Sequence, residues 1–360
     1  MPRILYGISP IGLGHATRSS VIVEELRRNG AEVRVFSGGR AAEFLRERGL
    51  GPDDVVDEAV PRVDGLEMYG VSLWYARSWL AQRRNVPRVK ELVGRFRPDI
   101  LVCDEEFSGM AAAGEAGLKR AFIADELLLG FARGWLARKI EGRVERWYAG
   151  LLASADLVIV PEEGEDGANR RYVGPIVRRP TMPAEEVRKR FGFPEGRLVL
   201  FSMSGSGIGR ELGSRLLSAL DADPLRDATL VVTGNRGKRF EGPRVRDLGV
   251  VGDNQDLVAC ADLVVSTAGK STIDEAASSG TPIVVIPIRH HAEQERNAAD
   301  LGYDWEDMAR LGELVEQKIG RRSAPREYRG EEAAARHIMA VAQAPRQPPF
   351  RAGPSAGAAP

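Results

Sequence analysis

The sequence has few cysteines, no excess of either charge and no long hydrophobic run, and each absence excludes a class of protein. Its only cysteines, Cys103 and Cys260, are far apart in apolar stretches. Two thiols cannot form a disulfide framework, so we expect both to be reduced core residues. Lys plus Arg and Asp plus Glu each number 51. This balance argues against a nucleic-acid binder, which is normally basic, and favours small molecules as partners.

No apolar run approaches the ~20 residues that a transmembrane helix requires. The N-terminus also lacks the basic segment and apolar segment of a secretory signal. Both observations predict a cytoplasmic protein. With 360 residues, 43% of them hydrophobic and 28% charged, the chain is typical of a globular protein. It exceeds what one hydrophobic core usually serves, so we expect two domains.

Short apolar runs alternate with longer helical patterns, which is typical of βαβ units and parallel sheets. In the first half we expect strands at residues 3–8, 32–36, 99–103, 121–124 and 156–160. The glycine and three prolines of 174–183 interrupt this pattern and predict a linker. The pattern then restarts with a strand, a glycine loop and a helix at 197–217, and further strands are expected at 228–233, 262–266 and 282–286.

These patterns predict a domain at 1–176 and a second domain at 177–342. The last stretch, 343–360, has too little hydrophobic content to fold and is expected to be a disordered tail. Each domain opens with a strand that leads through a glycine-rich turn into a helix. Such a turn suits anions, because free backbone N–H groups and the helix dipole point at the same place. Two such domains would face each other across a cleft.

Two nucleotide-binding motifs come close to matching. A dinucleotide fingerprint requires G-x-G-x-x-G and an acidic residue at the end of the second strand. Here Gly12 and Gly14 are followed by Thr17, and the second expected strand ends in a serine and two glycines. NAD binding therefore remains only an alternative. The GKST at 269–272 resembles the end of a P-loop, but the first glycine of that motif would fall at Val264, which excludes it.

The densest polar pattern lies between residues 261 and 299. One expected strand ends at Ser266, and a turn of small residues leads into a helix that carries Glu275. The next strand is followed by a polar loop with Glu293 and Gln294. Both loops follow the carboxyl ends of strands, where open α/β sheets bind ligands. The sequence therefore predicts a crevice formed by a helix N-terminus, a carboxylate and an acid–amide pair.

This segment resembles the donor site of the GT-B glycosyltransferases. The shared features are the small-residue turn at 269–272, Glu275, the tripeptide Gly-Thr-Pro at 280–282 before an apolar strand, and the dipeptides Glu-Gln and Asn-Ala that follow. The GLGHATRS at 12–19 is similar to the loop after the first strand in the same group, which includes the UDP-glycosyltransferases and the peptidoglycan N-acetylglucosaminyltransferase. The resemblance covers about residues 1–342. It implies an α/β fold of two Rossmann-like domains that face a central cleft.

The resemblance also implies a role for each matching residue of the donor site. The backbone of 269–272 would hold the diphosphate, Glu275 the ribose hydroxyls, and Glu293 with Gln294 the hydroxyls of the transferred sugar. The backbone of Val251 would contact the uracil. Lys270 departs from the small or polar residue of the group and either adds a cation near the phosphates or points to solvent. The residues implied in donor binding are Gly14, Ser204, Gly205, Ser206, Gly207, Val251, Gly269, Lys270, Ser271, Thr272, Glu275, Glu293 and Gln294.

Simpler explanations exist for several of these residues. An acidic residue one turn into a helix, such as Glu275, often only favours the helix N-terminus. The glycines at 205, 207 and 209 would also allow a tight turn without phosphate contact. His290 and His291 suggest a metal site, but zinc needs three or four ligands and the sequence offers no convincing partners. We expect these histidines to flank the donor site, and we expect no bound metal.

His15 is the candidate general base, because a histidine titrates near neutral pH and an acceptor hydroxyl must lose its proton as it attacks the anomeric carbon. Relatives of the plant type pair such a histidine with an aspartate that orients it. The resemblance places Asp104, at the end of an expected strand, in that position. Two alternatives remain open for His15: a neutral hydrogen-bond donor to phosphate, and a helix cap.

Together these features predict a glycosyltransferase of the hexosyltransferase type, inverting, metal-independent and UDP-dependent, with the nucleotide sugar as substrate and no cofactor. A nucleotide-sugar 2-epimerase on the same fold and a non-catalytic nucleotide-sugar-binding subunit remain alternatives. The acceptor is unknown, with lipid-linked and glycan acceptors both open. The helix at 135–152 combines apolar residues at helical spacing with arginines. That pattern favours a core-facing helix and leaves open peripheral contact with the inner face of a membrane.

Overall fold

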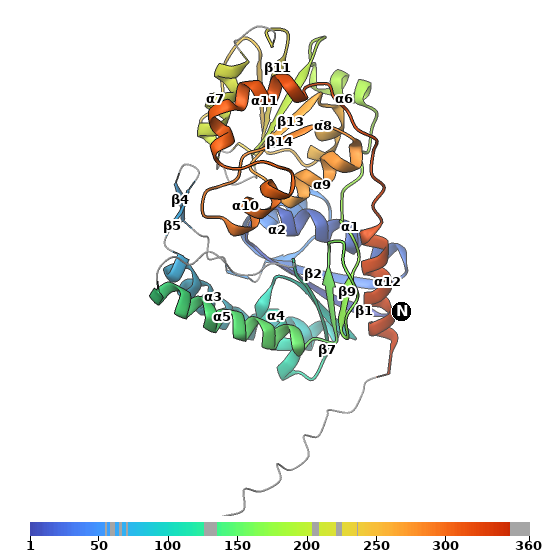
Figure 1. Ribbon diagram of the computed structural model, residues 1–360. Helices are drawn as coiled ribbons and strands as arrows, with labels where there is room; N and C mark the ends of the chain where they lie inside the picture. Colours follow the sequence, from blue (N-terminus) through green and yellow to red (C-terminus); the bar gives the residue numbers. More distant parts are fainter. Residues whose placement is uncertain are drawn as a thin grey trace, which may run out of the picture.

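The computed structural model contains two parallel β-sheets, one in each half of the chain, with helices packed around both (Figure 1). It describes residues 1–54, 56–57, 62–64, 67–69, 71–125, 135–203, 209–220, 225–235 and 237–345. The predicted α/β fold of two Rossmann-like domains is confirmed. The predicted donor-loop residues Ser204, Gly205, Ser206 and Gly207 lie outside the described residues.

The first sheet has the strand order β3-β2-β1-β6-β7-β8-β9, and its neighbouring strands pair in parallel. Its strands are β1 (Arg3–Ile8), β2 (Glu32–Ser37), β3 (Asp53–Asp54), β6 (Ile100–Asp104), β7 (Lys119–Ile123), β8 (Leu157–Val160) and β9 (Arg170–Tyr172). The helices of this half are α1 (Gly14–Arg28), α2 (Gly39–Glu47), α3 (Val71–Phe96), α4 (Phe107–Glu115) and α5 (Trp135–Ala153). An antiparallel pair, β4 (Arg62–Asp64) and β5 (Glu67–Tyr69), precedes α3.

The second sheet has the order β12-β11-β10-β13-β14 and is also parallel. Its strands are β10 (Leu198–Ser202), β11 (Thr229–Thr233), β12 (Val245–Gly249), β13 (Leu263–Ser266) and β14 (Ile283–Val285). The helices of this half are α6 (Ala184–Phe191), α7 (Arg210–Ala219), α8 (Asn254–Cys260), α9 (Lys270–Ser279), α10 (Ala292–Asp300), the short 3₁₀ helix η1 (Glu306–Arg310), α11 (Leu311–Lys318) and α12 (Gly330–Gln343).

The central strands of the first sheet, such as β1, β6 and β8, are largely apolar on both faces because both faces are buried. Successive residues of β1 point to opposite sides. Ile4 and Tyr6 pack in the core that includes residues of α1 and α12. Leu5 packs with Phe36 and residues of α3 and α4 on the other side. This double burial explains why parallel strands appear in the sequence as nearly continuous apolar runs.

In each sheet the strand order changes direction between two adjoining strands, β1 and β6 in the first sheet and β10 and β13 in the second. Open α/β sheets bind ligands at the carboxyl ends of strands at such points. His15 lies just after β1, and Asp104 is the last residue of β6. Gly269 lies between β13 and α9. The topology therefore places the sequence-predicted residues at the two positions where a ligand site is expected.

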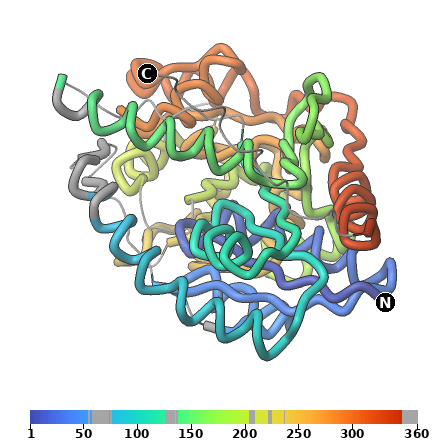
Figure 2. The backbone as a smooth tube through the Cα atoms, turned by 90° about the horizontal axis from the view of Figure 1, so that it is seen from below, coloured from blue at the N-terminus to red at the C-terminus, as the bar shows by residue number. Residues whose placement is uncertain are grey.

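The last helix, α12, returns to the first sheet, and Figures 1 and 2 show it beside the N-terminus. Its residues Ala334, Ala335 and Ile338 are fully buried in the same core as Ile4 of β1. The sequence pattern assigned residues up to 342 to the second domain, whereas this helix packs on the first. Its buried face is mostly alanine, so its composition gave no sign of which sheet it would cover. It ends at Gln343, inside the predicted tail, and residues 346–360 lie outside the described residues.

The expected strands agree with the observed ones to within two residues at each end. The sequence pattern did not predict the edge strands β3, β9 and β12 of the two sheets, nor the antiparallel pair β4 and β5. Cys103 and Cys260 are both buried and free, as predicted. The predicted linker, 174–183, lies between β9 and α6.

Candidate active site

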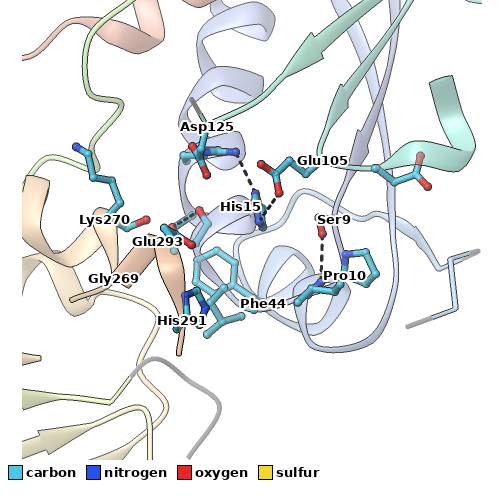
Figure 3. A pocket seen from close by; sticks show the side chains of 18 of the residues that line it. Ser9, Pro10, His15, Phe44, Glu105, Asp125, Gly269, Lys270, His291 and Glu293 are labelled. Atoms are coloured by element: carbon cyan, nitrogen blue, oxygen red, sulfur yellow. Dashed lines mark hydrogen bonds and ion pairs between the residues drawn. The ribbon is translucent and has the colours of Figure 1, made fainter. Parts of the chain in front are cut away.

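A cavity of about 770 Å³ lies between the two domains at the carboxyl ends of their strands (Figure 3). Asp104 lies beneath it and is completely buried. All the other predicted site residues that the structure describes line the cavity: Gly14, His15, Val251, Gly269, Lys270, Ser271, Thr272, Glu275, Glu293 and Gln294. The structure therefore brings together residues that lie up to 280 positions apart in the sequence, at the place where the topology predicts a ligand.

The N-termini of α1 and α9 meet in this cavity, one from each domain. Gly12, with a φ of 72°, turns the chain between β1 and α1, which begins at Gly14. A Cβ atom on Gly14 would lie 3.5 Å from Ser271 Oγ in the first turn of α9. The first backbone N–H groups of a helix have no partner within the helix, and its dipole is positive at that end. The arrangement therefore suits an anion such as a diphosphate.

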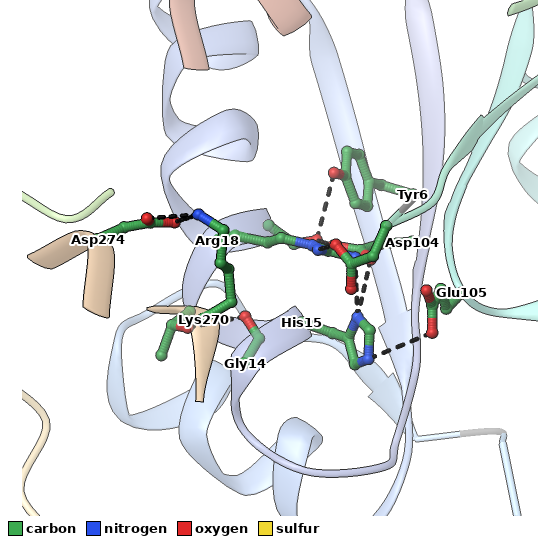
Figure 4. A network of polar contacts seen from close by, with 11 residues as sticks. Tyr6, Gly14, His15, Arg18, Asp104, Glu105, Lys270 and Asp274 are labelled. Carbon is green, nitrogen blue, oxygen red and sulfur yellow. Dashed lines mark hydrogen bonds and ion pairs between the residues drawn. The ribbon is translucent and has the colours of Figure 1, made fainter. Parts of the chain in front are cut away.

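His15 lies in the first turn of α1, and carboxylates lie next to both of its ring nitrogens (Figure 4). Its Nδ1 is 3.0 Å from Asp104 Oδ1. Its Nε2 is 3.5 Å from Glu105 Oε2. The imidazole is 18% exposed and Glu105 27%, so both can be reached from the cavity. The predicted pairing of His15 with Asp104 is thus present in the geometry, together with a second carboxylate that was not predicted.

Asp104 is held from several sides. Arg18, one turn after His15 on α1, donates from Nε to Asp104 Oδ2 at 2.9 Å and from Nη2 to Oδ1 at 2.5 Å. Ser19 Oγ donates to Asp104 Oδ2 at 2.6 Å. Burial by itself would raise the pKa of Asp104, but Arg18 and His15 outweigh it and hold the pKa well below its ordinary value. Asp104 is therefore a fixed anion that orients the imidazole.

His15 has an unusually high pKa. Burial lowers it, but the charges of Glu105 and Asp104 and the hydrogen bond to Asp104 outweigh burial and raise the pKa to about 9. In this ligand-free arrangement the imidazole is therefore protonated at pH 7. A protonated imidazole donates from both nitrogens, which matches the two carboxylates around it.

The backbone of Glu105 is strained. Its φ of 47° lies in the left-handed region, which costs a residue other than glycine on the order of 1–3 kcal/mol. Two further residues with this backbone, Ala268 (φ 53°) and His290 (φ 69°), lie in loops beside the same cavity. Such strain is found where surrounding structure fixes a side chain in a functional position. At Glu105 it turns the carboxylate toward His15 and the cavity.

The second domain adds a further carboxylate to this group. Glu293, in the first turn of α10, lines the cavity, and burial together with the charges of Asp125 and Glu105 raises its pKa to about 7. Asp125, two residues after β7, is ion-paired with Arg18. Carboxylates from both domains thus surround the two cations His15 and Arg18.

Glu275, the predicted ribose-binding residue, pairs with an arginine of the linker. Arg178 donates from Nε to Glu275 Oε1 at 2.9 Å, and both side chains are more than nine-tenths buried. Arg178 also donates from Nη1 to the carbonyl of Gly252 at 2.8 Å, next to the predicted uracil-contacting residue Val251. Burial raises the pKa of Glu275, while Arg178 acts in the opposite direction. Arg178 therefore connects the predicted ribose and base positions.

Two other predicted donor residues make contacts within the second domain. Lys270 forms an ion pair with Asp274, with Nζ 2.5 Å from Oδ2, and is one-third exposed. Its charge is therefore already neutralised one turn along α9. Gln294 accepts a hydrogen bond from the backbone N–H of Ile288 through Oε1 at 3.0 Å, which fixes the loop before α10.

The adjacent histidines do not form a metal site with other described residues. Among the residues described, no group of three or more His, Cys, Asp and Glu side chains is arranged to hold a metal ion. His291 lines the cavity, accepts from the N–H of Gln294 at 3.5 Å, and has its pKa lowered to about 4 by burial. It is therefore neutral at pH 7. The backbone N–H of His290 donates to Glu295 Oε1 at 2.7 Å.

The part of the cavity walled by the first domain is rich in aromatic residues. Trp74 and Trp79 of α3 and Trp147 and Tyr148 of α5 line it, with Phe107 of α4 between them. The rings of Phe107 and Trp147 have centroids 5.3 Å apart. The helix predicted at 135–152 is confirmed as α5, but it also presents exposed tryptophans.

Four residues of this site were not predicted from the sequence: Arg18, Glu105, Asp125 and Arg178. Arg18 lies three residues after His15, and that spacing places the two on one face of a helix. Glu105 directly follows Asp104, so the acidic pair at the end of β6 was a usable signal. Asp125 and Arg178 follow strand ends without a motif, and only the fold brings them to the cavity.

Comparison with known proteins finds glycosyltransferases among the relatives of this chain. The family model described as glycosyl transferase family 1 matches residues 2–119, and the glycosyltransferase family 28 C-terminal domain matches residues 230–319. An uncharacterized glycosyltransferase of Methanosarcina acetivorans is 26% identical over 319 residues, covering 82% of each chain. The UDP-N-acetylglucosamine–N-acetylmuramyl-(pentapeptide) pyrophosphoryl-undecaprenol N-acetylglucosamine transferase of Thermus thermophilus is 28% identical over 284 residues, covering 76% of this chain and 77% of its own.

Solved structures share the fold. The glycosyltransferase SnogD from Streptomyces nogalater aligns with a TM-score of 0.59 at 20% identity, over 94% of this chain and 99% of its own. The MnaA protein of S. aureus, solved with UDP, aligns with a TM-score of 0.61 at 14% identity, over 94% and 95% of the two chains. Both structures are similar to this chain in fold, that is, in the arrangement of the two domains.

The two Rossmann-like domains, the cavity between them and these matches define a glycosyltransferase with the GT-B fold. The chain is an enzyme of this class, and it is similar to members of the UDP-glycosyltransferase and peptidoglycan N-acetylglucosaminyltransferase group that the sequence resembled. This assignment favours sugar transfer over the two alternatives left open by the sequence. No helix among the described residues is long and apolar enough to cross a membrane.

Proposed function

We propose that this glycosyltransferase moves a sugar from a UDP-sugar to an acceptor hydroxyl in one displacement that inverts the anomeric carbon, without a metal ion. The observation that carries the proposal is the His15–Asp104 pair at 3.0 Å in a cavity that also contains the N-termini of α1 and α9. The Thermus relative is named for a UDP-N-acetylglucosamine donor. Neighbouring structures hold UDP and thymidine diphosphate, which supports a nucleoside diphosphate as the donor part.

The chemical step follows from these positions. The free N–H groups of α9, aided by α1, hold the diphosphate as charge develops on it. His15, oriented through Nδ1 by Asp104 and with its own Nε2 proton already released, takes the acceptor proton at Nε2. The acceptor oxygen then bonds to the anomeric carbon, and the bond from that carbon to the diphosphate breaks with its electron pair leaving on the phosphate. One displacement of this kind inverts the configuration, which NMR of the product would establish.

The ribose site can be tested with the Glu275→Gln variant. Glutamine keeps an acceptor for Arg178 but loses the charge that would accept from both ribose hydroxyls. Hydrogen bonds to a charged group contribute about 1.5–3 kcal/mol, so UDP affinity measured by calorimetry should fall by roughly ten- to a hundred-fold. Glutamine is preferred to alanine because alanine would leave Arg178 as an unpaired buried cation.

Glu211→Gln is the matched control for this experiment. Glu211 lies on α7, is half exposed, and pairs with Arg215 on the same helix. The control should bind UDP as tightly as the parent. Equal UDP affinity in the Glu275 variant and the parent would show that the donor does not bind at this carboxylate.

Metal independence gives a second test. Helix N-termini and backbone amides can neutralise a diphosphate without a divalent ion. We therefore expect turnover with a UDP-sugar to be unchanged by excess EDTA and by added Mg²⁺ or Mn²⁺. The control is the same protein passed over a chelating resin before the assay. A strict requirement for Mn²⁺ would contradict this part of the proposal.

For the acceptor, the aromatic wall formed by α3, α4 and α5 supports a molecule with an apolar body. Trp79 is 51% exposed and Trp147 46%. Arginines lie among them, and Arg83 stacks over the Trp79 ring at 4.1 Å. Tryptophan together with basic residues suits both a lipid-linked acceptor and the surface of an anionic membrane. Peripheral membrane contact and the nature of the acceptor stay predictions.

A further inference from the structure

His15 has two carboxylate neighbours, and they are held very differently. Asp104 is completely buried and is fixed by Arg18 and Ser19 as well as by His15. Glu105 is 27% exposed, lines the cavity and lies 3.5 Å from Nε2, farther than the 3.0 Å between Nδ1 and Asp104. Within the described part of the chain, His15 is its only partner at ion-pair distance. Asp104 is thus the permanent partner and Glu105 the exchangeable one.

Nε2 is also the nitrogen that the proposed reaction needs, because Nδ1 is committed to Asp104. A base can act only through a nitrogen that carries no proton and faces the substrate. In the structure Nε2 faces Glu105 (Figure 4). The strained backbone at Glu105 is consistent with a carboxylate fixed in this place by the surrounding fold.

Resting on the function proposed above, we propose that Glu105 is a positioning residue that occupies Nε2 of His15 in the acceptor-free enzyme and keeps the imidazole from activating water. Base catalysis then begins only when an acceptor hydroxyl replaces Glu105 at that nitrogen. The Nε2 proton passes to the Glu105 carboxylate, which leaves His15 neutral and Glu105 as the acid. The acceptor proton then moves to Nε2 as the acceptor oxygen bonds to the anomeric carbon. The Glu105 proton is lost to solvent after products leave.

The charges around His15 and Glu105 agree with this order of proton transfers. His15 faces Asp104 and Glu105 at the end of β6 and Arg18 on α1, while Asp125 after β7 and Glu293 on α10 lie close enough to act on Glu105 or His15. Tyr148 of α5 lies near enough for the charge of Glu105 to raise its pKa. Burial, followed by the charge of Asp125, raises the pKa of Glu105, against the effect of His15. Glu105 is therefore a carboxylate able to take up a proton.

This arrangement protects the sugar donor from hydrolysis. An unprotonated base in a cavity that holds a nucleotide sugar would also activate water and hydrolyse the donor. With the pKa of His15 at about 9, about 1% of the imidazole is unprotonated at pH 7. Lowering that pKa by one pH unit would raise the unprotonated fraction roughly tenfold. Replacing Glu105 should therefore increase wasteful hydrolysis.

The first test needs no substrate, so it is independent of the proposed function. The titration of the His15 ring is followed by NMR in the parent, Glu105→Gln and Glu115→Gln, with the signal assigned by its loss in His15→Gln. Glu115 is the matched control because it lies on α4, is about half exposed and pairs with Lys90. We expect the pKa of His15 to fall by at least about one pH unit in Glu105→Gln and to stay unchanged in Glu115→Gln. An unchanged His15 pKa in Glu105→Gln would overturn the proposal.

The second test measures UDP release from UDP-glucose and from UDP-N-acetylglucosamine without acceptor, over the pH range 5–10. At pH 7 we expect roughly tenfold faster release in Glu105→Gln than in the parent, with the acid limb of the profile at lower pH. Glu105→Asp restores the charge, so both the rate of UDP release and the acid limb of the pH profile should return toward those of the parent. Slower release in Glu105→Gln at every pH would overturn the protective role. No turnover in any variant, together with the expected NMR shift, would instead contradict the proposed function and leave the pairing of Glu105 intact.

Discussion

Replacing His15 with alanine is expected to reduce the single-turnover rate of sugar transfer by roughly 10²–10⁴-fold, the usual contribution of a positioned general base. The imidazole lies in the cavity with Nδ1 held by Asp104, and no other described side chain has the same arrangement of a ring nitrogen and an orienting buried carboxylate. Donor affinity should remain nearly intact, because the proposed diphosphate contacts come from backbone amides. Rapid-quench measurement of one turnover and calorimetry with UDP, on the same protein, give both quantities.

The same two measurements distinguish the role of His15 as general base from its alternative role as a hydrogen-bond donor to the diphosphate. If His15 donated a hydrogen bond to the diphosphate, the alanine variant would bind UDP more weakly and lose little rate. A variant with the full single-turnover rate would remove His15 from the mechanism. His337→Ala is the control, because His337 lies on α12, away from the residues that line the cavity, and its loss should change neither quantity.

Asp104→Asn is expected to reduce the free energy of unfolding by about 3–5 kcal/mol, in addition to lowering turnover. The substitution keeps the shape of the side chain but places an amide where Arg18, His15 and Ser19 all donate to a carboxylate. It leaves the buried guanidinium of Arg18 with Asp125 as its remaining ion-pair partner among the described residues. Urea unfolding of parent and variant measures the difference.

Asp227→Asn provides the matched comparison. Asp227 also pairs with an arginine, Arg197, but its side chain is 55% exposed. Exposed pairs contribute little, so this control should lose less than about 1 kcal/mol. Equal losses in the two variants would mean that the Asp104 network does not behave as a buried ion pair.

The effect of Asp104 should depend on pH in a defined direction. Its pKa is lower in the folded chain than the ordinary carboxyl value of about 3.9, so its stabilisation is complete above that value and is lost as the pH falls toward the folded pKa. The difference between parent and Asp104→Asn should therefore shrink below about pH 4. His15 acts in the opposite direction. Its raised pKa stabilises the fold below about pH 6.5, and this contribution is lost as the pH rises through about 9.

Much of the fold could be predicted from the sequence because parallel strands buried on both faces are apolar along their whole length. The central strands, such as residues 3–8, were located on that basis. The edge strand β9 was missed because its three residues, Arg170–Tyr172, are half-buried and two of them are arginines. The packing of α12 on the first sheet is decided by tertiary contacts of alanines, which carry no information about their partner.

The candidate site could be predicted only where chemistry and local spacing coincide. His15 lies in the first turn of α1 and Glu275 in the second turn of α9, and each helix follows a strand, so their positions could be predicted from the chain. The pairing of Glu275 with Arg178 could not, because it joins α9 to a linker residue 97 positions away in the sequence. The high pKa of His15 likewise depends on Glu105, whose orientation is set by a left-handed backbone conformation that could not be predicted from the sequence.

The return of α12 to the first sheet means that the chain passes between the domains twice, and the two crossings touch. Gly330, at the start of α12, approaches the first crossing so closely that a Cβ atom there would lie 2.6 Å from the carbonyl oxygen of Gly174. Arg179 and Glu331 pair across the same place at 2.8 Å. The second domain is thus joined to the first by two adjoining segments. We expect any change in the width of the cleft to occur by backbone rotation at these two segments.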